Sequence, residues 1–291
     1  LGTADAQRVE VLSFTRLANT VFNSVGWDKG KRLNEAGKIL LMSRALEQCA
    51  DKLTVYARSA DSPAVVRELL VLSEEFCQCA ISSEDIVSAM NNMDEGLLKD
   101  KLGDISLVFS VYDSFVSDGW LDDSRMLTRL KDKLTESGYF KNKTVFFDSF
   151  RGFTAQEFGI IGKILTQADD VCVALNAPDL TDVGSDDIFY HTKNTAKKLI
   201  KIANSVDVPC AKPVTVNEPN SDAALDALAK DFLSPEADVF EGECGSIAVV
   251  AAPDIRSECA FIAAQIKKML RTGEYRSRDI AVIVRDDKSY I

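Results

Sequence analysis

The segment from Lys143 to Leu165 constrains the fold of this chain most, because a strand and a helix follow each other there with clear boundaries. Residues 144–147 are β-branched or aromatic and predict a short buried strand. A helix is predicted to start after Thr154, an N-cap residue, with Glu157 three residues later completing a capping box and Phe153 facing Phe158 as a hydrophobic staple. A second strand is predicted at 171–175. The order strand, helix, strand predicts two parallel strands.

A carboxylate follows the first predicted strand. In open parallel sheets, ligands bind beyond the carboxyl ends of the strands, which is where Asp148 is expected. In P-loop NTPases an acid at this position holds magnesium, and an acid directly after it polarises the attacking water. Here Ser149 follows instead, and a serine cannot serve as that base. The pair therefore has the position of a nucleotide site without its chemistry; the alternative interpretation makes Asp148 only a turn former.

Composition limits the partners of the chain. Its 291 residues are enough for about two domains, and 46% of them are hydrophobic. The formal net charge is -11, so affinity for nucleic acid requires a local basic surface. A single histidine, His191, excludes a multi-His metal site, and we assign no catalytic residue and no metal site. Seven scattered cysteines, no signal peptide and no apolar run of ~18 residues indicate a cytoplasmic protein without membrane contact.

Near the N-terminus, residues 9–14 predict a strand, and a helix is expected from there to about Val25. The following Gly30 and Lys31 invite comparison with the phosphate-binding P-loop, G-x-x-x-x-G-K-[ST]. The glycine spacing is one residue short, Arg32 replaces the hydroxyl residue, and the segment follows a helix where a P-loop follows a strand. We therefore reject a P-loop here.

From Asn34 to about Leu134 the pattern is helical throughout. Because strands are predicted on both sides, we expect a helical bundle inserted into an α/β domain. The apolar positions at helical spacing form three long stripes and a short fourth one: Met42, Leu46, Cys49, Leu53 and Tyr56; Val65, Leu69, Leu72, Phe76 and Cys79; Leu98, Leu102, Ile105, Phe109, Tyr112 and Phe115; and Leu127, Leu130 and Leu134.

The remaining third of the chain alternates loops and helices. A loop at 176–179 is expected at the same sheet edge as Asp148, and a helix at about 186–203. Residues 217–243 are strongly acidic and predict a connector with a short helix. A second unit is then expected, with a strand after Ser246, a helix closed by Gly273, and a strand at 280–284, which predicts the start of a second parallel sheet.

Three segments carry a resemblance to a known family. VLSFTRLA at 11–18, VFFDSFRGFTAQEFGII at 145–161 and SECAFIAAQIKKMLRTGEYRSRDIAVIVR at 257–285 resemble AddB (RexB), the non-motor components of bacterial AddAB helicase-nucleases. The segments occur in the order found in that family, with a helical insertion between the first two. Together the matches extend over nearly the whole chain.

The resemblance implies an α/β fold of the P-loop NTPase class, similar to superfamily 1 helicases, with a parallel sheet and a large all-helical insertion. On this basis residues 1–30 and 140–215 form the first helicase-like α/β domain, without its P-loop segment. Residues 31–139 are the helical insertion, 216–244 an acidic connector, and 245–291 the beginning of a second helicase-like α/β domain.

The resemblance also implies site residues. Residues 13–17 match the segment that contacts single-stranded DNA in active relatives. Asp148 and Ser149 match the Asp-Glu motif of active motors and are expected to be a vestigial nucleotide and magnesium site. From their places near predicted strand ends, Phe14, Arg16 and Arg151 are predicted to contact DNA, and Thr15 is added as part of the matching segment 13–17.

The implied partners are an AddA-type motor subunit, in a heterodimer, and single-stranded and duplex-end DNA. The implied role is to guide and scan single-stranded DNA during repair of double-strand breaks. No cofactor is expected in this fragment, whereas ATP and magnesium are expected for the complex and an iron-sulfur cluster in an absent C-terminal region. Two alternatives stay open: an active ATP-dependent helicase whose P-loop was lost by truncation, and a protein-interaction scaffold without DNA contact.

Overall fold

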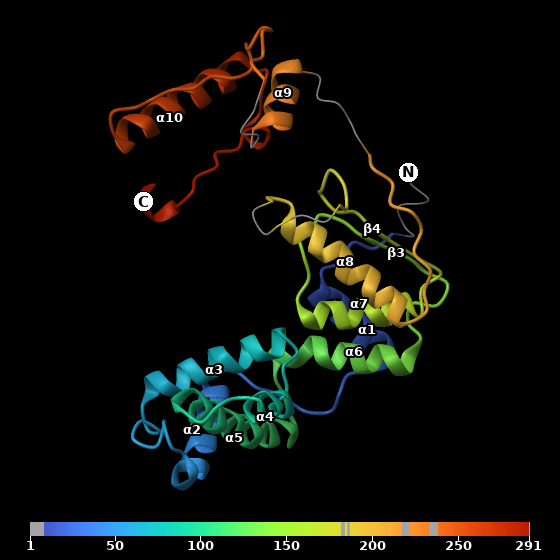
Figure 1. The fold of residues 1–291 in the computed structure, drawn as a ribbon, viewed down its shortest axis with the longest axis vertical. Helices are drawn as coiled ribbons and strands as arrows, with labels where there is room; N and C mark the ends of the chain where they lie inside the picture. The colour runs from blue at the N-terminus through green and yellow to red at the C-terminus, as the bar shows by residue number, and fades with distance from the viewer. Residues whose placement is uncertain (1–8, 182–183, 185–186, 217–221, 233–237, 291) are drawn as a thin grey trace. The chain divides into compact units, whose positions relative to one another are not determined.

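The computed structural model describes residues 9–181, 184, 187–216, 222–232 and 238–290 (Figure 1). The chain divides into two compact units, Leu1–Thr215 and Val216–Ile291.

The first unit is mostly helical and contains two small parallel sheets. Its elements, in chain order, are α1 (Phe14–Val25), β1 (Lys31–Arg32), α2 (Glu35–Cys49), the 3-10 turn η2 (Ala50–Lys52), α3 (Pro63–Gln78), α4 (Ser83–Asn91), α5 (Leu97–Ser117), β2 (Trp120–Leu121), η3 (Asp123–Arg125), α6 (Met126–Ser137), β3 (Thr144–Phe147), α7 (Ala155–Leu165), β4 (Asp170–Val173) and α8 (Tyr190–Ser205).

The strand, helix, strand unit predicted from the sequence is confirmed, but its first strand is not the buried strand predicted, because only Phe147 is buried and Phe146 is 73% exposed. β3 has the predicted bounds, and β4 pairs with it in parallel, with Thr144 opposite Asp170 and Phe147 opposite Val173. Each sheet found among the described residues has two strands. The chain is therefore an α/β protein in which helices predominate.

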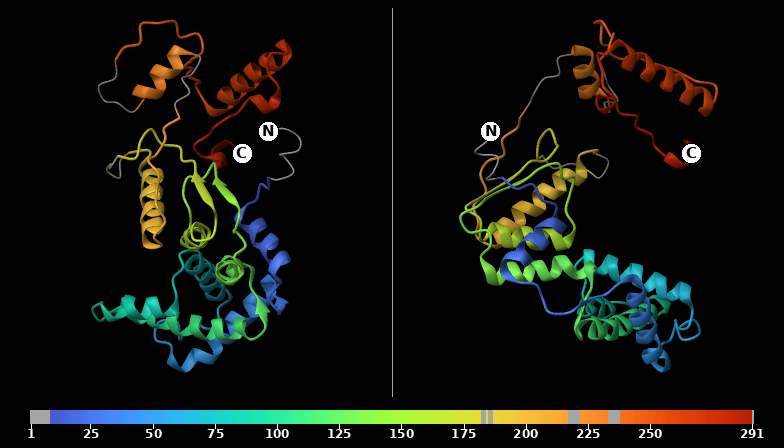
Figure 2. Two further views of the ribbon diagram at one scale, coloured as in Figure 1. Left: turned by 90° about the vertical axis from the view of Figure 1, so that its right-hand side faces the viewer. Right: turned by 180° about the vertical axis from the view of Figure 1, so that it is seen from behind.

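The predicted start of α7 is also confirmed. The Thr154 hydroxyl accepts a hydrogen bond from the backbone N–H of Glu157 (3.3 Å), and the Glu157 carboxylate accepts one from the backbone N–H of Thr154 (2.8 Å). These two bonds satisfy N–H groups that a helix start otherwise leaves unpaired. The face that α7 buries completely consists of Ile160, Ile161 and Ile164. Figure 2 shows from two further sides that α7 lies between the β3–β4 sheet and α6.

Helix α6 does not pack in the helical bundle, where its leucines were predicted to lie. Leu130 and Leu134 of α6 are completely buried, in the hydrophobic core formed with α1 and α7. The expectation that they belong to the helical bundle is therefore wrong. Helical spacing identifies the apolar face of a helix but not the partner that covers it, and here the partners are α1, more than 100 residues earlier, and α7.

The helical bundle consists of α2, α3, α4 and α5, with a separate core that includes Met42, Leu46, Leu69 and Tyr112. Most positions of three predicted stripes are thus confirmed as core, whereas Cys79 and Leu98 are exposed. Asp104 of α5 is also buried, at 4% exposure. Its carboxylate accepts hydrogen bonds from the backbone N–H groups of Thr54, Val55 and Tyr56 at 2.8–3.1 Å, so α5 holds the turn that follows η2.

The predicted strand at 9–14 is not formed. Residues 9–13 have no ladder partner among the described residues, and Val11 is 86% exposed. Helix α1 begins at Phe14, because the Ser13 side chain accepts a hydrogen bond from the backbone N–H of Arg16 and caps it. Phe14, Thr15 and Arg16 therefore lie in the first turn of a helix rather than at a strand end.

The second unit contains α9 (Ala223–Asp231), α10 (Ile255–Thr272) and the 3-10 turns η4 (Ser277–Asp279) and η5 (Asp287–Tyr290). The two predicted helices are confirmed, and Gly273 ends α10 at φ 74°. The strands predicted after Ser246 and at 280–284 are not formed: these segments have no ladder partner in the described part of the chain, and Val249 and Ile283 are more than 90% exposed. β-branched residues favour an extended backbone, but a strand also requires a hydrogen-bonding partner.

Candidate functional site

The carboxyl end of β3 is exposed, as the sequence predicted. Asp148 and Ser149 both face solvent directly after the last paired residue, Phe147. Ser149 has φ 65°, in the left-handed region that residues with a Cβ rarely occupy. The chain turns sharply at Ser149 and leaves the sheet toward α7.

A cluster of phenylalanines joins this turn to the start of α1. The ring of Phe14 lies 6.1 Å from that of Phe147, 5.8 Å from that of Phe150 and 6.2 Å from that of Phe153, measured between centroids. Phe153 in turn contacts Phe158 of α7 at 5.5 Å, the predicted hydrophobic staple. Phe14 stacks on Phe147 and meets Phe150 and Phe153 edge to face, and aromatic pairs of these two kinds contribute about 0.5–1.5 kcal/mol each beyond their area. Two segments far apart in sequence are thereby fixed beside each other.

This contact brings together the two segments predicted to contact DNA. Thr15, Arg16 and Arg151 are all exposed, and each is within two residues of a ring in the cluster. Phe14 is only 8% exposed, with other rings against it. It offers no free ring face to a base, so packing in the core is the role that the structure gives it.

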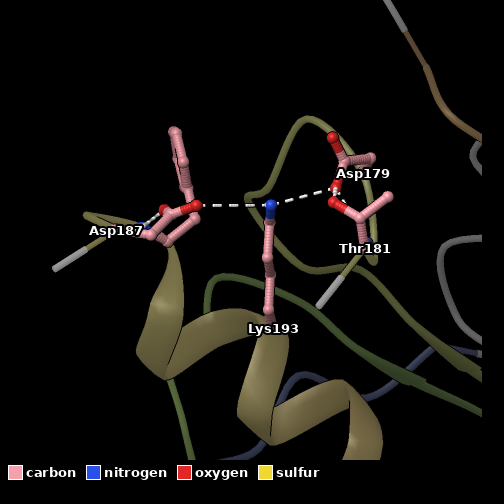
Figure 3. A network of polar contacts seen from close by, with 5 residues as sticks. Asp179, Thr181, Asp187 and Lys193 are labelled. Carbon is pink, nitrogen blue, oxygen red and sulfur yellow. Dashed lines mark hydrogen bonds and ion pairs between the residues drawn. The ribbon is translucent and has the colours of Figure 1, made fainter. Parts of the chain in front are cut away.

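A buried lysine lies on the helix that follows β4. The Lys193 side chain, on α8, is 4% exposed, and its ammonium lies 2.9 Å from an oxygen of Asp179 and 3.4 Å from an oxygen of Asp187 (Figure 3). Asp179 also accepts hydrogen bonds from the hydroxyl (2.6 Å) and backbone N–H (2.8 Å) of Thr181. The Thr181 hydroxyl and then Lys193 lower the pKa of Asp179 to about 2, and Asp179 raises the pKa of Lys193.

Helix α8 also supports the turn after Ser149. The Thr195 hydroxyl lies 3.5 Å from the carbonyl oxygen of Arg151, and a Cβ added to Gly152 would lie 3.2 Å from that hydroxyl. Sequence reasoning did not identify Lys193 or Thr195. Two acids, Asp179 and Asp187, precede Lys193 in sequence, but this spacing does not show that their carboxylates meet its ammonium.

The chemistry available at this sheet edge is limited. Asp148 supplies one carboxylate and Ser149 supplies no base. No group of three or more His, Cys, Asp or Glu side chains suited to a metal ion occurs in the part of the chain that the structure describes. A magnesium ion here would depend on Asp148 and on the oxygens of a bound nucleotide. Among the described residues, the end of β3 thus presents one carboxylate, Asp148, and one hydroxyl, Ser149.

Fold and site together define an α/β protein whose parallel strand, helix, strand unit carries an exposed aspartate at the end of its first strand. The model of the family described as "ADDB, N-terminal" matches residues 2–229. The chain therefore belongs to the AddB N-terminal family, as its three sequence segments indicated.

Curated relatives are similar over nearly the whole chain. A protein of Caldanaerobacter subterraneus subsp. tengcongensis is 29% identical over 98% of the chain, and one of Clostridium tetani is 29% identical over all of it. One of Thermoanaerobacter sp. is 28% identical over 97%. Each carries the name of the B-type subunit of an ATP-dependent helicase/deoxyribonuclease. The chain spans about a quarter of the length of these relatives: 25%, 26% and 25%.

Among the described residues, no helix has both the length and the apolar character needed to cross a membrane.

Proposed function

We propose that this chain belongs to the non-motor, helicase-like subunit of a heterodimeric helicase-nuclease that processes DNA double-strand ends for recombinational repair. Its relatives are named as one subunit of an ATP-dependent helicase/deoxyribonuclease, which supports a DNA-processing complex with a second subunit. In this proposal the partner is an AddA-type motor, which binds ATP and magnesium, and the complex works in the cytoplasm. An iron-sulfur cluster belongs to a region outside this chain.

The observation that carries the non-motor assignment is Ser149 directly after Asp148. Hydrolysis by P-loop proteins requires a group that orients or polarises the attacking water next to the magnesium-binding carboxylate. A serine hydroxyl is a weak base, and the backbone at Ser149 turns away at φ 65°. We propose that this edge is a vestigial nucleotide site that has kept its position in the fold and lost its reaction.

The domain division is part of the proposal. The sequence predicted residues 1–30 and 140–215 as the first helicase-like domain and 31–139 as the helical insertion; we now propose that α6 belongs to the first domain, and we keep 216–244 as the connector and 245–291 as the start of a second helicase-like domain. The separate core of α2–α5 supports an inserted bundle. Because α6 packs against α1 and α7, the insertion as a packing unit ends before α6.

We further propose that Thr15, Arg16 and Arg151 contact single-stranded DNA and guide it past the sheet edge. The Phe14–Phe150 contact, which holds their two segments side by side, supports this role, and both arginines are exposed. An arginine binds phosphate through its fixed fork of N–H donors, so two of them define a path for a phosphate backbone.

A binding experiment tests the proposed function. The full subunit, alone and with its motor partner, is titrated with a fluorescent ATP analogue plus magnesium and with labelled forked DNA at low and moderate salt. We expect no magnesium-dependent nucleotide binding by the subunit alone and salt-sensitive DNA binding by the complex. Tight nucleotide binding by the subunit alone would establish an active motor instead. Absence of DNA binding at every salt concentration would favour a protein-interaction scaffold.

The DNA contacts are tested in the same assay with the double variant Arg16→Glu/Arg151→Glu. We expect weaker DNA binding and a smaller salt dependence, because each lost phosphate contact lowers the slope by about 0.7 for single strands. Arg58→Glu/Arg67→Glu is the matched control, since both arginines are exposed on the helical bundle. Equal effects of the two double variants would assign the change to total charge alone.

A further inference from the structure

The segment rejected as a P-loop forms a short parallel ladder with a distant part of the chain. β1 pairs in parallel with β2, with Lys31 opposite Trp120 and Arg32 opposite Leu121. The backbone N–H of Lys31 donates to the carbonyl of Gly119 (2.9 Å). A Cβ on Gly30 would lie only 2.9 Å from Leu121, so the close approach of the two segments requires glycine there.

Both tryptophans of the chain are at this ladder and both are exposed, Trp27 at 45% and Trp120 at 38%. Trp27 is nevertheless held in place. Its ring lies 5.1 Å from that of Phe22, and its indole N–H donates to the Asn23 side chain at 2.8 Å. A large aromatic side chain that is fixed but half open to solvent loses little conformational freedom when a ligand binds to it.

Three cations accompany the tryptophans: Lys29, Lys31 and Arg32 are exposed, and none of the ion pairs among the described residues includes them. The acid between Trp27 and Lys29 is Asp28, and it is already paired, 3.0 Å from Lys133 and 3.7 Å from Arg129. In a chain with net charge -11, these three cations thus have no ion-pair partner among the described residues, although the exposed Asp118 and Asp123 flank β2.

Cations and rings are combined on both faces of the ladder. The guanidinium of Arg32 lies 5.9 Å from the centroid of the Trp27 ring. Lys31 is the register partner of Trp120, and partners in a parallel ladder share a face, whereas successive residues alternate faces. Each tryptophan therefore has a cation beside it.

We propose that this basic-aromatic ladder, consisting of Trp27, Lys29, Lys31, Arg32 and Trp120, is a binding site for single-stranded DNA. Because Lys31 with Trp120 and Arg32 with Trp27 lie on opposite faces of the ladder, the strand passes around its edge, with a base stacked on each exposed indole and the backbone phosphates paired with the three cations. An acidic protein surface would satisfy the cations, but it would leave the two indole faces without partners. The inference rests on the proposed function and adds a second DNA contact, on elements other than the β3 edge.

The charge of the ladder is tested with Lys29→Gln/Lys31→Gln/Arg32→Gln in the complex of the full subunit and its motor partner, using labelled oligo-dT. We expect the slope of log K against log salt to fall by about 2, because three phosphate contacts are lost at about 0.7 each. The control is Lys141→Gln/Lys201→Gln/Lys212→Gln, which removes the same charge from exposed positions elsewhere. An unchanged slope in the ladder variant, or an equal fall in the control, overturns the site.

The aromatic contact is tested separately with Trp27→Leu and Trp120→Leu, which keep an apolar side chain. We expect each to weaken oligo-dT binding roughly five- to hundredfold, and Trp27→Phe to restore much of the loss, because a phenyl ring still stacks. Phe232→Leu, at an exposed aromatic in the second unit, is the control. Photocrosslinking of iodouracil-substituted DNA is expected to label Trp27 or Trp120, and thermal melts check that the variants fold.

The outcomes separate this site from the proposed function. Unchanged oligo-dT binding by the ladder variants, with wild-type binding intact, refutes the site and leaves the proposed function standing. No binding by the wild-type complex refutes both. If the ladder variants instead lose the motor partner while DNA binding by the free subunit is unchanged, the surface is a protein interface and the inference is wrong.

Discussion

Ser149 has a backbone conformation that glycine adopts at lower cost. Its φ of 65° places Cβ close to the following carbonyl, and its exposed side chain forms no hydrogen bond with the described residues that offsets this. We expect Ser149→Gly to raise the free energy of unfolding by about 0.5–1 kcal/mol in urea denaturation. Ser149→Ala keeps the conformation and should change it little. A destabilising Ser149→Gly would show that the serine side chain holds the turn.

Asp104, in contrast to the exposed Ser149, is buried, and hydrogen bonds from backbone N–H groups stabilise its carboxylate. Its two oxygens accept bonds from three consecutive backbone N–H groups, those of Thr54, Val55 and Tyr56. We expect Asp104→Asn to lower the free energy of unfolding by about 2–4 kcal/mol, because the new NH2 group is directed at N–H donors. Urea denaturation measures this.

The matched control for Asp104 is Asp100→Asn, four residues earlier on α5 and exposed. It removes the same charge, and the loss of a negative charge near the start of a helix should lower the free energy of unfolding by less than about 1 kcal/mol. Equal losses in the two variants would mean that the buried hydrogen bonds of Asp104 add nothing beyond its charge.

At the scale of elements, Lys193 connects α8 to the loop after β4 through Asp179 and Asp187. The pKa of Asp179 is lowered from 3.8 to about 2, so its stabilising contribution is complete above pH 3.8 and is lost as the pH falls toward 2. The pKa of Lys193 is raised above 10.5, so its contribution is complete below pH 10.5 and is lost as the pH rises through the higher folded value. Between these limits the contribution of the ion pair to stability does not depend on pH.

The cause of the lowered pKa of Asp179 is testable by carboxyl-carbon NMR titration. We expect Lys193→Met to raise this pKa but to leave it below 3.8, because both Thr181 donors remain. Thr181→Val should raise it too, since the hydroxyl is the largest cause. Lys201→Met, two turns further along α8 and exposed, should leave it unchanged. A titration of Asp179 near 3.8 in the wild type would contradict the observed contacts.

At the scale of the whole molecule, the two units differ in how many of their side chains are buried. Unit Leu1–Thr215 has two hydrophobic cores, whereas in the described part of unit Val216–Ile291 only Ala224 is buried and α10 buries no residue. Local stability follows buried apolar contacts. We expect limited proteolysis of this chain to cleave within the second unit first and to leave a resistant product ending near residue 215. Early cleavage within α2–α5 would contradict this order.

The parts of the fold that the sequence predicted well depend on local interactions. The bounds of β3, the capping box of Thr154 and the staple of Phe153 with Phe158 all involve residues within five positions of each other or a single apolar run. The wrongly predicted strands, in contrast, would need pairing partners elsewhere in the chain. Residues 9–13 and 280–284 have the composition of strands, but no described residue pairs with them.

In the candidate site, too, the features set by local sequence were predicted, and those set by long-range contacts were not. The position of Asp148 at a strand end followed from the strand itself, whereas the burial of Phe14 depended on rings at 147, 150 and 153. Lys193 could not be found from the sequence, because a lysine on a helix is ordinarily solvated and only its two carboxylate partners make its burial favourable.

The sequence by itself determined where α7 begins, much of the apolar face of the bundle helices, and that one strand, helix, strand unit is parallel, because propensity, capping and periodicity act over a few residues. Only the tertiary structure decided that α6 packs with α1 and α7, that Phe14 is buried, and that Trp120 lies across from Lys31. These features depend on which surfaces meet after chain reversals of up to about a hundred residues, and no local pattern encodes that choice.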